Sequence, residues 1–257
     1  MQRIPIAKAC AALLILLVVG LASAAAGIKI GQYYQSNLWC CGIESRARNV
    51  VLSTREAFGL AHYYGQIGQD KWVTQVMFPG VRDGYFVDVG SADGTHNSNT
   101  KALEQRGWRG ICIDPFPKNM QDRTCQMFRD VVYHTTGERV TFELPSGNSG
   151  DEGGSGAIVD RAAPGARTMA FTTVSLADIL DRAHAPAFIN YISMDIEGAE
   201  LEALRGFPWA AHTVGAWTIE HNFAEPRRTE IRDLLASHGY QRVHTWMQDD
   251  FYARVPR

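Results

Sequence analysis

The sequence has few cysteines, and their arrangement argues against two kinds of stabilised domain. Five occur in 257 residues, namely Cys10, Cys40, Cys41, Cys112 and Cys125. The count is odd and no Cys-x-x-Cys pair is present, so we expect neither a disulfide framework nor a structural zinc site. Cys40 and Cys41 follow an apolar segment and are either inert, which is favoured, or acylated at a membrane surface.

The sequence also lacks an excess of charge of either sign. Its 25 Lys and Arg residues nearly balance 27 Asp and Glu residues, which gives a net charge of −2. Binding to a nucleic-acid backbone needs a basic surface, so nucleic acid is not an expected partner. Hydrophobic residues at 46% and charged residues at 20% are ordinary for a globular chain. Beyond the N-terminal segment roughly 200 residues remain, which suffices for one domain and not for two.

The N-terminal segment is the part of the chain that carries no charge over a long stretch. Residues 9–28 are uncharged and lie between Lys8 and Lys29. A helix of that length crosses a hydrocarbon core of about 30 Å, so the segment predicts a membrane span. A cleaved signal peptide is the alternative, because Arg3 and Lys8 precede the apolar run and residues 22–24 (Ala-Ser-Ala) suit a cleavage site. The uncleaved anchor is favoured, because the apolar run continues past that site.

These observations predict an organisation in four parts. A short basic N-terminus covers residues 1–8, a transmembrane anchor 9–28, an aromatic stem or linker 29–50, and a single globular domain 51–257. Basic residues on the two sides of the anchor are too evenly distributed to fix its orientation. We therefore expect a single-pass membrane protein whose domain can lie on either side.

In the globular part, apolar strands and helical segments alternate, which predicts a doubly wound α/β domain with a mostly parallel sheet. The expected strands are 84–89, 110–114, 131–134, 189–195 and 214–220, with a terminal pair at 241–245 and 250–255. The expected helices are 53–64, 98–106, 119–128, 175–183, 198–205 and 226–238. Residues 140–144 add a strand to an edge hairpin, and the glycine-rich segment 146–156 (SGNSGDEGGSG) is expected to form a mobile loop or lid.

The turn after the first strand lacks the G-x-G-x-x-G spacing of dinucleotide-binding proteins. It reads Asp88-Val-Gly90-Ser91-Ala-Asp93-Gly94, with its two glycines four positions apart. The G-x-G-x-x-G spacing brings a helix N-terminus against a pyrophosphate. The broader turn here suits an uncharged ribose and an amino-acid group instead.

A carboxylate at the end of the second strand supports the same interpretation. Asp114 stands there, followed by Pro115, at the position where an adenosine ribose would present its hydroxyls. The distance from Gly90 to Asp114 fits one turn, one helix and one strand. A structural βα turn and a solvated strand end are the alternatives, but the combination of the two features favours a binding site.

Several ordered motifs resemble those of the FkbM-type methyltransferases, a family of class I enzymes that use S-adenosylmethionine and mostly methylate hydroxyl oxygens. The likeness covers most of residues 65–254. It is carried by 65–70 (GQIGQD), 84–94 (GYFVDVGSADG), 98–100 (SNT) with Glu104, 107–115 (GWRGICIDP), 195–200 (DIEGAE), 220–222 (EHN) and 239–240 (GY). Many relatives carry Glu at the position of Asp114, and the segment 146–156 is peculiar to this chain.

The resemblance implies a Rossmann-like sheet of seven strands with S-adenosylmethionine over the glycine turn and Asp114 on its ribose. The residues expected to bind this cofactor are Asp88, Gly90, Ser91, Asp93, Gly94, Ser98, Asn99, Asp114 and Pro115. His96 and Asn97 follow the glycine turn and could contact the methionine end or the acceptor, but capping of the next helix by Asn97 or Ser98 is the simpler interpretation. Because the cofactor is made in the cytosol, a cytosolic domain is favoured over one on the other side of the membrane.

Methyl transfer also needs a group that takes the proton of the acceptor hydroxyl. The candidates stand at the ends of the fourth and fifth strands, where ligands bind in doubly wound folds. His221 has the most suitable unperturbed pKa, Asp195 is the other candidate base, and Glu220 accompanies them. A buried structural histidine is an equal alternative for His221. We assign no metal, although these residues with Glu197 and Asn222 could instead hold Mg²⁺ or Ca²⁺.

The function expected from the sequence is O-methylation of a sugar, a glycan or another hydroxylated small molecule. The alternative is a protein that is not an enzyme, namely a membrane-anchored scaffold built on a methyltransferase fold. The polar residues at the strand ends, Asp195, Glu220, His221 and Asn222, argue against it. An NAD-linked oxidoreductase of the same sheet class is disfavoured by the glycine spacing.

Overall fold

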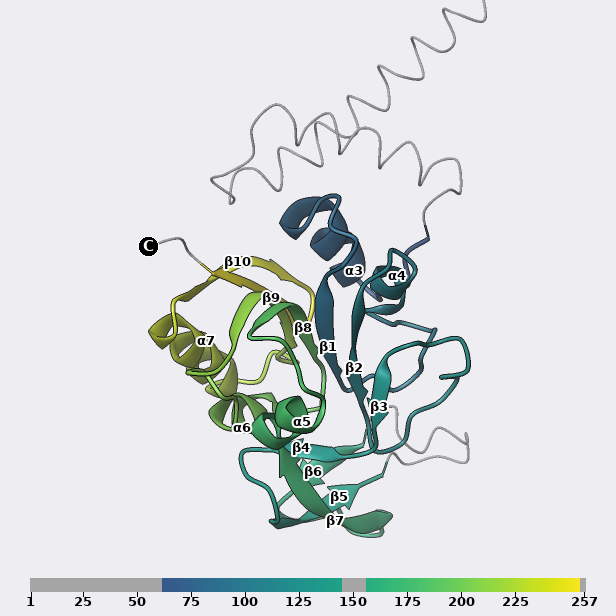
Figure 1. Cartoon of the computed structure of the whole chain (residues 1–257). Coiled ribbons are helices and arrows are strands. Elements are labelled where there is room, and N and C mark those ends of the chain that lie inside the picture. The colour runs from purple at the N-terminus through teal and green to yellow at the C-terminus, as the bar shows by residue number, and fades with distance from the viewer. Residues whose placement is uncertain (1–61, 145–155, 255–257) are drawn as a thin grey trace, which may run out of the picture. The chain divides into compact units, whose positions relative to one another are not determined.

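The computed structural model of the chain describes residues 62–144 and 156–254. By its internal contacts the chain divides into two units, Met1–His62 and Tyr63–Arg257, and the described helices and strands all belong to the second. Figure 1 shows these elements. They are α3 (Gln69–Trp72), the π-helix η1 (Val73–Met77), β1 (Tyr85–Val89), α4 (Lys101–Glu104), β2 (Arg109–Ile113), β3 (Gln126–Phe128), β4 (Val131–Tyr133), β5 (Arg139–Glu143), β6 (Ala157–Val159), β7 (Thr168–Ser175), α5 (Leu176–Arg182), β8 (Phe188–Met194), α6 (Glu200–Arg205), β9 (Thr213–Glu220), α7 (Arg227–Ser237), β10 (Tyr240–Trp246) and β11 (Asp249–Arg254).

The larger sheet has seven strands in the order β10-β11-β9-β8-β1-β2-β3. The five strands from β9 to β3 run parallel to one another, and β11 and β10 are antiparallel to their neighbours. The chain winds outward from β1 through β2 to β3 on one side and from β8 to β9 on the other. This reversal between β1 and β8 is where ligands bind in open α/β sheets. The predicted mostly parallel seven-stranded α/β sheet is confirmed.

The core follows from the alternation of side chains along the central strands. Val87 and Val89 of β1 join one apolar cluster with residues of α5, α6 and α7, which lie together in Figure 1. The intervening Asp88 points to the opposite face, where it meets Thr100 before α4. Asp88 therefore faces the segment that follows the carboxyl end of β1, while Val87 and Val89 hold the sheet to the helices.

A second sheet of four strands, in the order β4-β7-β5-β6, departs from the predicted strand pairing. The strand expected at 131–134 is present as β4, but it pairs in parallel with β7, which was not predicted. The strand expected at 140–144 is β5, and it pairs with β6 and β7 instead of forming a hairpin with β4. β7, from Thr168 to Ser175, is long enough to pair with both strands. Its last three residues pair with β4, and the preceding five pair with β5.

The helix predicted at 119–128 is wrong. The segment ends in β3, which pairs in parallel with β2 and so forms the edge of the large sheet. The preceding residues are not helical because the Glu104 carboxylate accepts hydrogen bonds from the backbone N–H groups of Thr124 and Cys125. These amides are therefore not available for helical hydrogen bonds.

The expectation about cysteines needs a correction as well. Cys112 of β2 and Cys125 form a disulfide, 13 residues apart in sequence. The odd cysteine count argued against a framework of several bridges, but it carries no information about one bridge between two neighbouring strands. This bond closes the loop that connects β2 and β3.

The predicted location at a membrane is contradicted. Among residues 62–144 and 156–254, no helix is long and apolar enough to cross a membrane. The predicted anchor at 9–28 and the stem at 29–50 lie outside the described residues, as do most of the helix expected at 53–64 and of the loop expected at 146–156. We therefore withdraw the predicted membrane location.

Candidate active site

A pocket opens at the carboxyl ends of β1, β2 and β8, where the winding of the sheet reverses. Its empty space is about 600 Å³, which includes the open mouth. The lining residues come from the glycine turn, the ends of β2 and β8, and the second sheet: Gly90, Ala92, Ile113, Asp114, Pro115, Asp130, Val131, Val132, Phe142, Gly156, Ile158, Asp195, Ile196, Glu197 and Ala199. A small molecule placed there would touch both sheets.

The glycine turn joins the three central strands. The N–H groups of Gly90 and Ser91 donate to the carbonyl oxygen of Ile113 on β2, at 2.8 and 3.1 Å. Gly90 has a φ of +87°. A Cβ atom at this position would lie 1.7 Å from the carbonyl oxygen of Asp195. Glycine is required here, because the turn passes directly against the backbone at the end of β8.

Asp114 joins the turn to the end of β2. It is buried, and its carboxylate accepts hydrogen bonds from the N–H of Ala92 at 2.8 Å and from the N–H of Phe116 at 2.7 Å. Burial raises the pKa of this carboxyl group, and the two hydrogen bonds act in the opposite direction. Since Asp114 also lines the pocket beside Pro115, it can both shape the turn and accept from a ligand.

Asp93 and Gly94 brace the far side of the turn and do not line the pocket. The Asp93 carboxylate accepts from the N–H groups of Thr95 and His96 and from the side chain of Asn119. Although burial alone would raise it, these hydrogen bonds lower the pKa of Asp93. The N–H of Gly94 donates to the carbonyl oxygen of Lys118 at 2.8 Å.

Three other predicted cofactor ligands lie behind the turn. Asp88 accepts a hydrogen bond of 2.5 Å from Thr100, and Ser98 accepts one from the N–H of Lys101, the first residue of α4, whose N-cap is Thr100. The side-chain amide of Asn99 donates to Ser193 of β8. Burial raises the pKa of Asp88, which the nearby Arg123 guanidinium opposes. Asp88, Ser98 and Asn99 therefore position the turn. Ser91, by contrast, has a buried hydroxyl with no hydrogen-bond partner among the described residues.

A carboxylate group forms the other part of the site. The side-chain oxygens of Asp195, Glu197 and Glu220 lie within 4.8 Å of one another, a spacing that could hold a divalent cation. Burial, and then the neighbouring Glu220 carboxylate, raise the pKa of Asp195 well above its usual range. Burial raises the pKa of Glu220 to about 7. Like charges in one buried site share protons in this way.

Neighbouring residues hold Glu220 in place. The side-chain amide of Asn222 donates to Glu220 at 2.7 Å. Asp249 of β11 stands opposite Glu220 in the sheet, and its own carboxylate accepts from Gln69 at 2.9 Å. Burial raises the pKa of Asp249 to about 6. Gln69 and Asp249 were not among the predicted site residues, although Gln69 belongs to one of the motifs on which the family resemblance rests.

His221 is buried and does not line the pocket. Its Nδ1 accepts a hydrogen bond from the N–H of Phe223 at 3.0 Å, and its Nε2 lies 3.7 Å from the carboxylate of Asp250. Burial lowers the pKa of this imidazole. Asp195 and Glu220 are thus close together, while His221 faces a different carboxylate.

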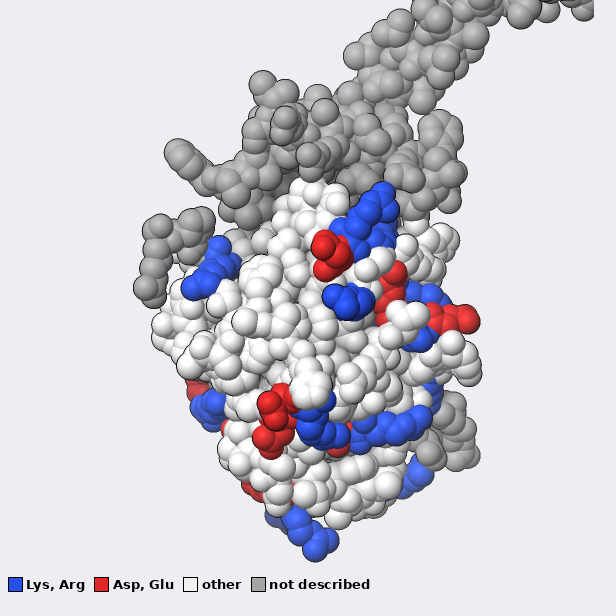
Figure 2. Space-filling model, viewed as in Figure 1, with Lys and Arg blue, Asp and Glu red and all other residues white. Residues whose placement is uncertain are grey.

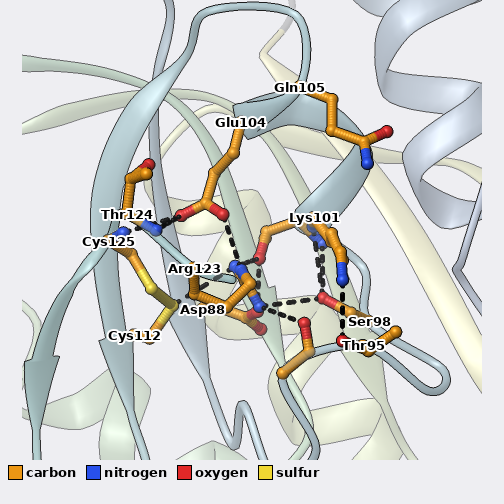
Figure 3. Close-up of polar contacts among 12 residues, drawn as sticks. Asp88, Thr95, Ser98, Lys101, Glu104, Gln105, Cys112, Arg123, Thr124 and Cys125 are labelled. Atoms are coloured by element: carbon orange, nitrogen blue, oxygen red, sulfur yellow. Dashed lines mark hydrogen bonds and ion pairs between the residues drawn. A yellow bond between two sulfur atoms is a disulfide. The ribbon is translucent and has the colours of Figure 1, made fainter. Parts of the chain in front are cut away.

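Arg123 is another residue of this region that the sequence did not indicate. Its buried guanidinium lies behind the glycine turn, 2.6 Å from the hydroxyl of Thr100, and Figure 3 shows the guanidinium among its neighbours. The segment was predicted to be a helix, and no motif includes Arg123. Strand pairing of β3 with β2, the disulfide and the hydrogen bonds of Glu104 together bring this segment to the turn.

Comparisons with known proteins give a family and a similar solved structure. A family model described as the methyltransferase FkbM domain matches residues 88–242. A crystal structure of methyltransferase FkbM from Methylobacillus flagellatus is similar, with 16% sequence identity and a TM-score of 0.47, over 90% of this chain. The chain spans 60% of the length of that protein. No curated protein matches the chain.

Proposed function

The chain belongs to the FkbM methyltransferase family, and from this premise we propose that it uses S-adenosylmethionine to methylate a hydroxyl group of a sugar, a glycan or another small molecule. The observation that carries the proposal is the junction of the glycine turn and Asp114 at one pocket. The sequence predicted ligand contacts separately for the glycine turn and for the end of β2. The carboxylate of Asp114 joins these two segments through its hydrogen bond with Ala92.

The residues of the pocket fit the proposed cofactor. Each oxygen of Asp114 accepts one backbone hydrogen bond, which leaves capacity for ribose hydroxyl donors. Ser91 stands between the lining residues Gly90 and Ala92, and its buried hydroxyl has no hydrogen-bond partner among the described residues. Ile113, Val131 and Ile196 give the pocket apolar walls, which suit an adenine ring.

When bound, the cofactor would supply a methyl group on a sulfonium, and the protein must then align the acceptor oxygen and take its proton. We assign the proton to the pair of Asp195 and Glu220. Asp195 lines the pocket, and its carboxylate lies beside that of Glu220. A base with a pKa near the working pH is effective, and the pKa of Glu220 of about 7 meets this condition. His221 is less suited, since its Nδ1 already accepts from Phe223.

The test is calorimetric titration of S-adenosylhomocysteine into the full chain and into Asp114→Ala. The wild type should bind, and Asp114→Ala should bind at least about tenfold more weakly, because a charged acceptor for two hydroxyls is lost. Asp114→Glu should retain binding. Asp122→Ala, at an exposed carboxylate of the following loop, is the matched control. Equal binding by the wild type and Asp114→Ala would refute the assigned site, and no binding by the wild type would refute the cofactor.

A further inference from the structure

The buried Arg123 side chain connects the β2–β3 loop to the glycine turn. Its side chain is 1% exposed and pairs at 2.6 Å with Glu104, which is 5% exposed. Beyond this pair, the guanidinium donates to four further acceptors, drawn in part in Figure 3: the carbonyl oxygen of Gly94, the hydroxyls of Ser98 and Thr100, and the sulfur of Cys112. One cation thus joins the end of the turn, the start of α4 and β2.

These contacts bear on the part of the turn that the cofactor would touch. Thr100 accepts from Arg123 and donates to the buried Asp88 at the start of the turn. Gly94, at the end of the turn, accepts from the same guanidinium at 3.1 Å. Arg123 therefore holds both ends of the seven-residue turn. It also supplies a positive charge to Asp88, a buried carboxylate that would otherwise lack a counter-charge.

The position of Arg123 is in turn set by its neighbours in the loop. Two residues later, Cys125 is joined to Cys112 by the disulfide. Cys112 lies two residues before Asp114, on the strand that carries the second half of the site. Glu104 accepts from the N–H groups of Thr124 and Cys125. The disulfide and Glu104 thus keep the segment that carries Arg123 against β2.

We propose that Arg123 is a positioning residue for the cofactor-binding turn, and that the Cys112–Cys125 disulfide sets its place, so that reduction of this bond weakens cofactor binding. The inference rests on the proposed function, because it concerns the affinity of the same site. The ligand class is S-adenosyl amino acids, and the effect is exerted through Asp88 and Gly94 without contact between Arg123 and the ligand.

The chemistry is thiol–disulfide exchange with a dithiol. Cys112 is fully buried and Cys125 is half-buried, so a thiolate of the reagent attacks the sulfur of Cys125. The protein S–S bond breaks, a mixed disulfide forms, and Cys112 leaves as a thiolate beside the Arg123 guanidinium, 3.3 Å away. The second thiol of the reagent then displaces Cys125. The dithiol is oxidised to a cyclic disulfide and both cysteines end as thiols, Cys112 after taking up a proton.

Reduction changes how Arg123 is held. The loop loses its covalent tie to β2, so the segment that carries Arg123 is kept there by the hydrogen bonds of Glu104 and by strand pairing alone. The guanidinium is then less firmly placed, and the turn that it holds is released.

The first experiment measures S-adenosylhomocysteine affinity of the full chain by calorimetry, oxidised and after treatment with dithiothreitol. The affinity should fall about threefold or more on reduction and recover on reoxidation. Cys125→Ser should bind like the reduced wild type and be insensitive to dithiothreitol, which assigns the effect to this bond among the five cysteines.

The second experiment replaces the guanidinium. Arg123→Ala should lower the affinity by about tenfold or more, and Arg123→Lys should restore part of it, since the charge near Asp88 returns. Arg109→Ala is the matched control, at an exposed arginine at the start of the same strand as Cys112. If Arg123→Ala does not fold, Arg123→Lys tests the guanidinium, since it keeps the charge and loses the contacts to Gly94, Ser98 and Thr100, and the reduction arm tests the disulfide without any substitution.

The outcomes separate this inference from the proposed function. An oxidised wild type that binds no S-adenosylhomocysteine refutes the proposed function itself. A wild type that binds equally well before and after reduction, or an Arg123→Ala protein that binds like the wild type, overturns the role assigned to the disulfide or to Arg123.

Discussion

At the scale of single residues, four of the eight described non-glycine residues with a positive φ follow the carboxyl ends of parallel strands. Ala92 after β1, Glu197 after β8, and Asn222 and Phe223 after β9 all have positive φ values between 33° and 56°. Such conformations cost energy in residues other than glycine, and they cluster at functional sites. Three parallel strands of the sheet are thus followed by strained turns, which agrees with the location of the pocket.

Gly90 allows a direct test of how tightly the turn is held. Gly90→Ala should lower the free energy of unfolding by about 3 kcal/mol or more, because the new Cβ meets the Asp195 carbonyl in addition to the cost of a positive φ. Gly137→Ala is the matched control, since its φ is +93° with no atom within 4 Å of the new Cβ. It should cost about 1 kcal/mol. Urea unfolding measures both, and similar values for the two would contradict the close approach.

The sequence predicted the residues that lie directly at strand ends, and it missed those that reach the site from elsewhere. Asp114 and Asp195 were found because each follows an apolar strand at a motif, and both line the pocket. Arg123 and Asp249 reach the site through strand pairing, which no local pattern encodes. His221 occupies a strand end too, but its ring faces Asp250, and side-chain direction cannot be derived from spacing.

At the scale of elements, the strands of the large sheet were predictable and those of the small sheet only in part. β1, β8 and β9 are buried apolar runs of five to eight residues bounded by turns. β7 is mostly exposed along its first half, so it lacks the apolar run that marks a buried strand. β3 has three residues, too few for any period to appear.

An aromatic cluster joins the small sheet to the pocket. Phe116, which follows β2, packs against Phe142 of β5 and Phe171 of β7, with ring centroids 5.5–5.9 Å apart. Phe142 is buried and also lines the pocket. The small sheet thus forms one wall of the candidate cofactor site.

Removing the central ring should affect stability and binding together. Phe142→Ala should lower the free energy of unfolding by about 3 kcal/mol, as is usual for a buried phenylalanine, and weaken S-adenosylhomocysteine binding. Phe188→Ala, at a ring that is 49% exposed, should change neither by much. Hydrogen exchange of the β5 and β7 amides would show whether the loss is local. Unchanged binding would separate the small sheet from the pocket.

At the scale of the whole molecule, the surface carries charges of both signs, whereas acidic groups gather at the carboxyl ends of β8 and β9. On the face seen in Figure 2, basic and acidic groups both occur, with uncharged areas between them. The carboxyl ends of β8 and β9, by contrast, gather Asp195, Glu220 and Asp249 with raised pKa values. These groups bind protons more tightly in the folded chain than in the unfolded chain.

The global stability should therefore depend on pH in a defined direction. A carboxyl group whose pKa is raised on folding stabilises the fold below its unfolded pKa, and this stabilisation is lost as the pH rises through the folded pKa. With the pKa of Glu220 at about 7 and that of Asp249 at about 6, the free energy of unfolding should fall between pH 5 and pH 8.

Glu220→Gln provides the check, because it removes the charge and keeps the shape. It should raise the free energy of unfolding at pH 8 by about 1 kcal/mol and flatten the decline from pH 5. Asp122→Asn, at an exposed carboxylate of the β2–β3 loop, should leave the profile unchanged. Urea unfolding at several pH values measures the stability of all three proteins. A stability that rises toward pH 8 would refute the claim that folding raises the pKa values of these carboxyl groups.

The contacts of Gln66 and Gln69 with Gln248 and Asp249 have a consequence for how the protein is made. Gln69, the first residue of α3, donates to Asp249, 180 residues later in the chain, and Gln248 donates to Gln66. Since synthesis proceeds from the N-terminus, Gln66 and Gln69 leave the ribosome long before their partners have been translated. A nascent chain that ends after β9 contains Glu220 but not Asp249, so Gln69 cannot yet make its contact. The surroundings of Glu220 are therefore among the last parts of the fold to be completed during synthesis.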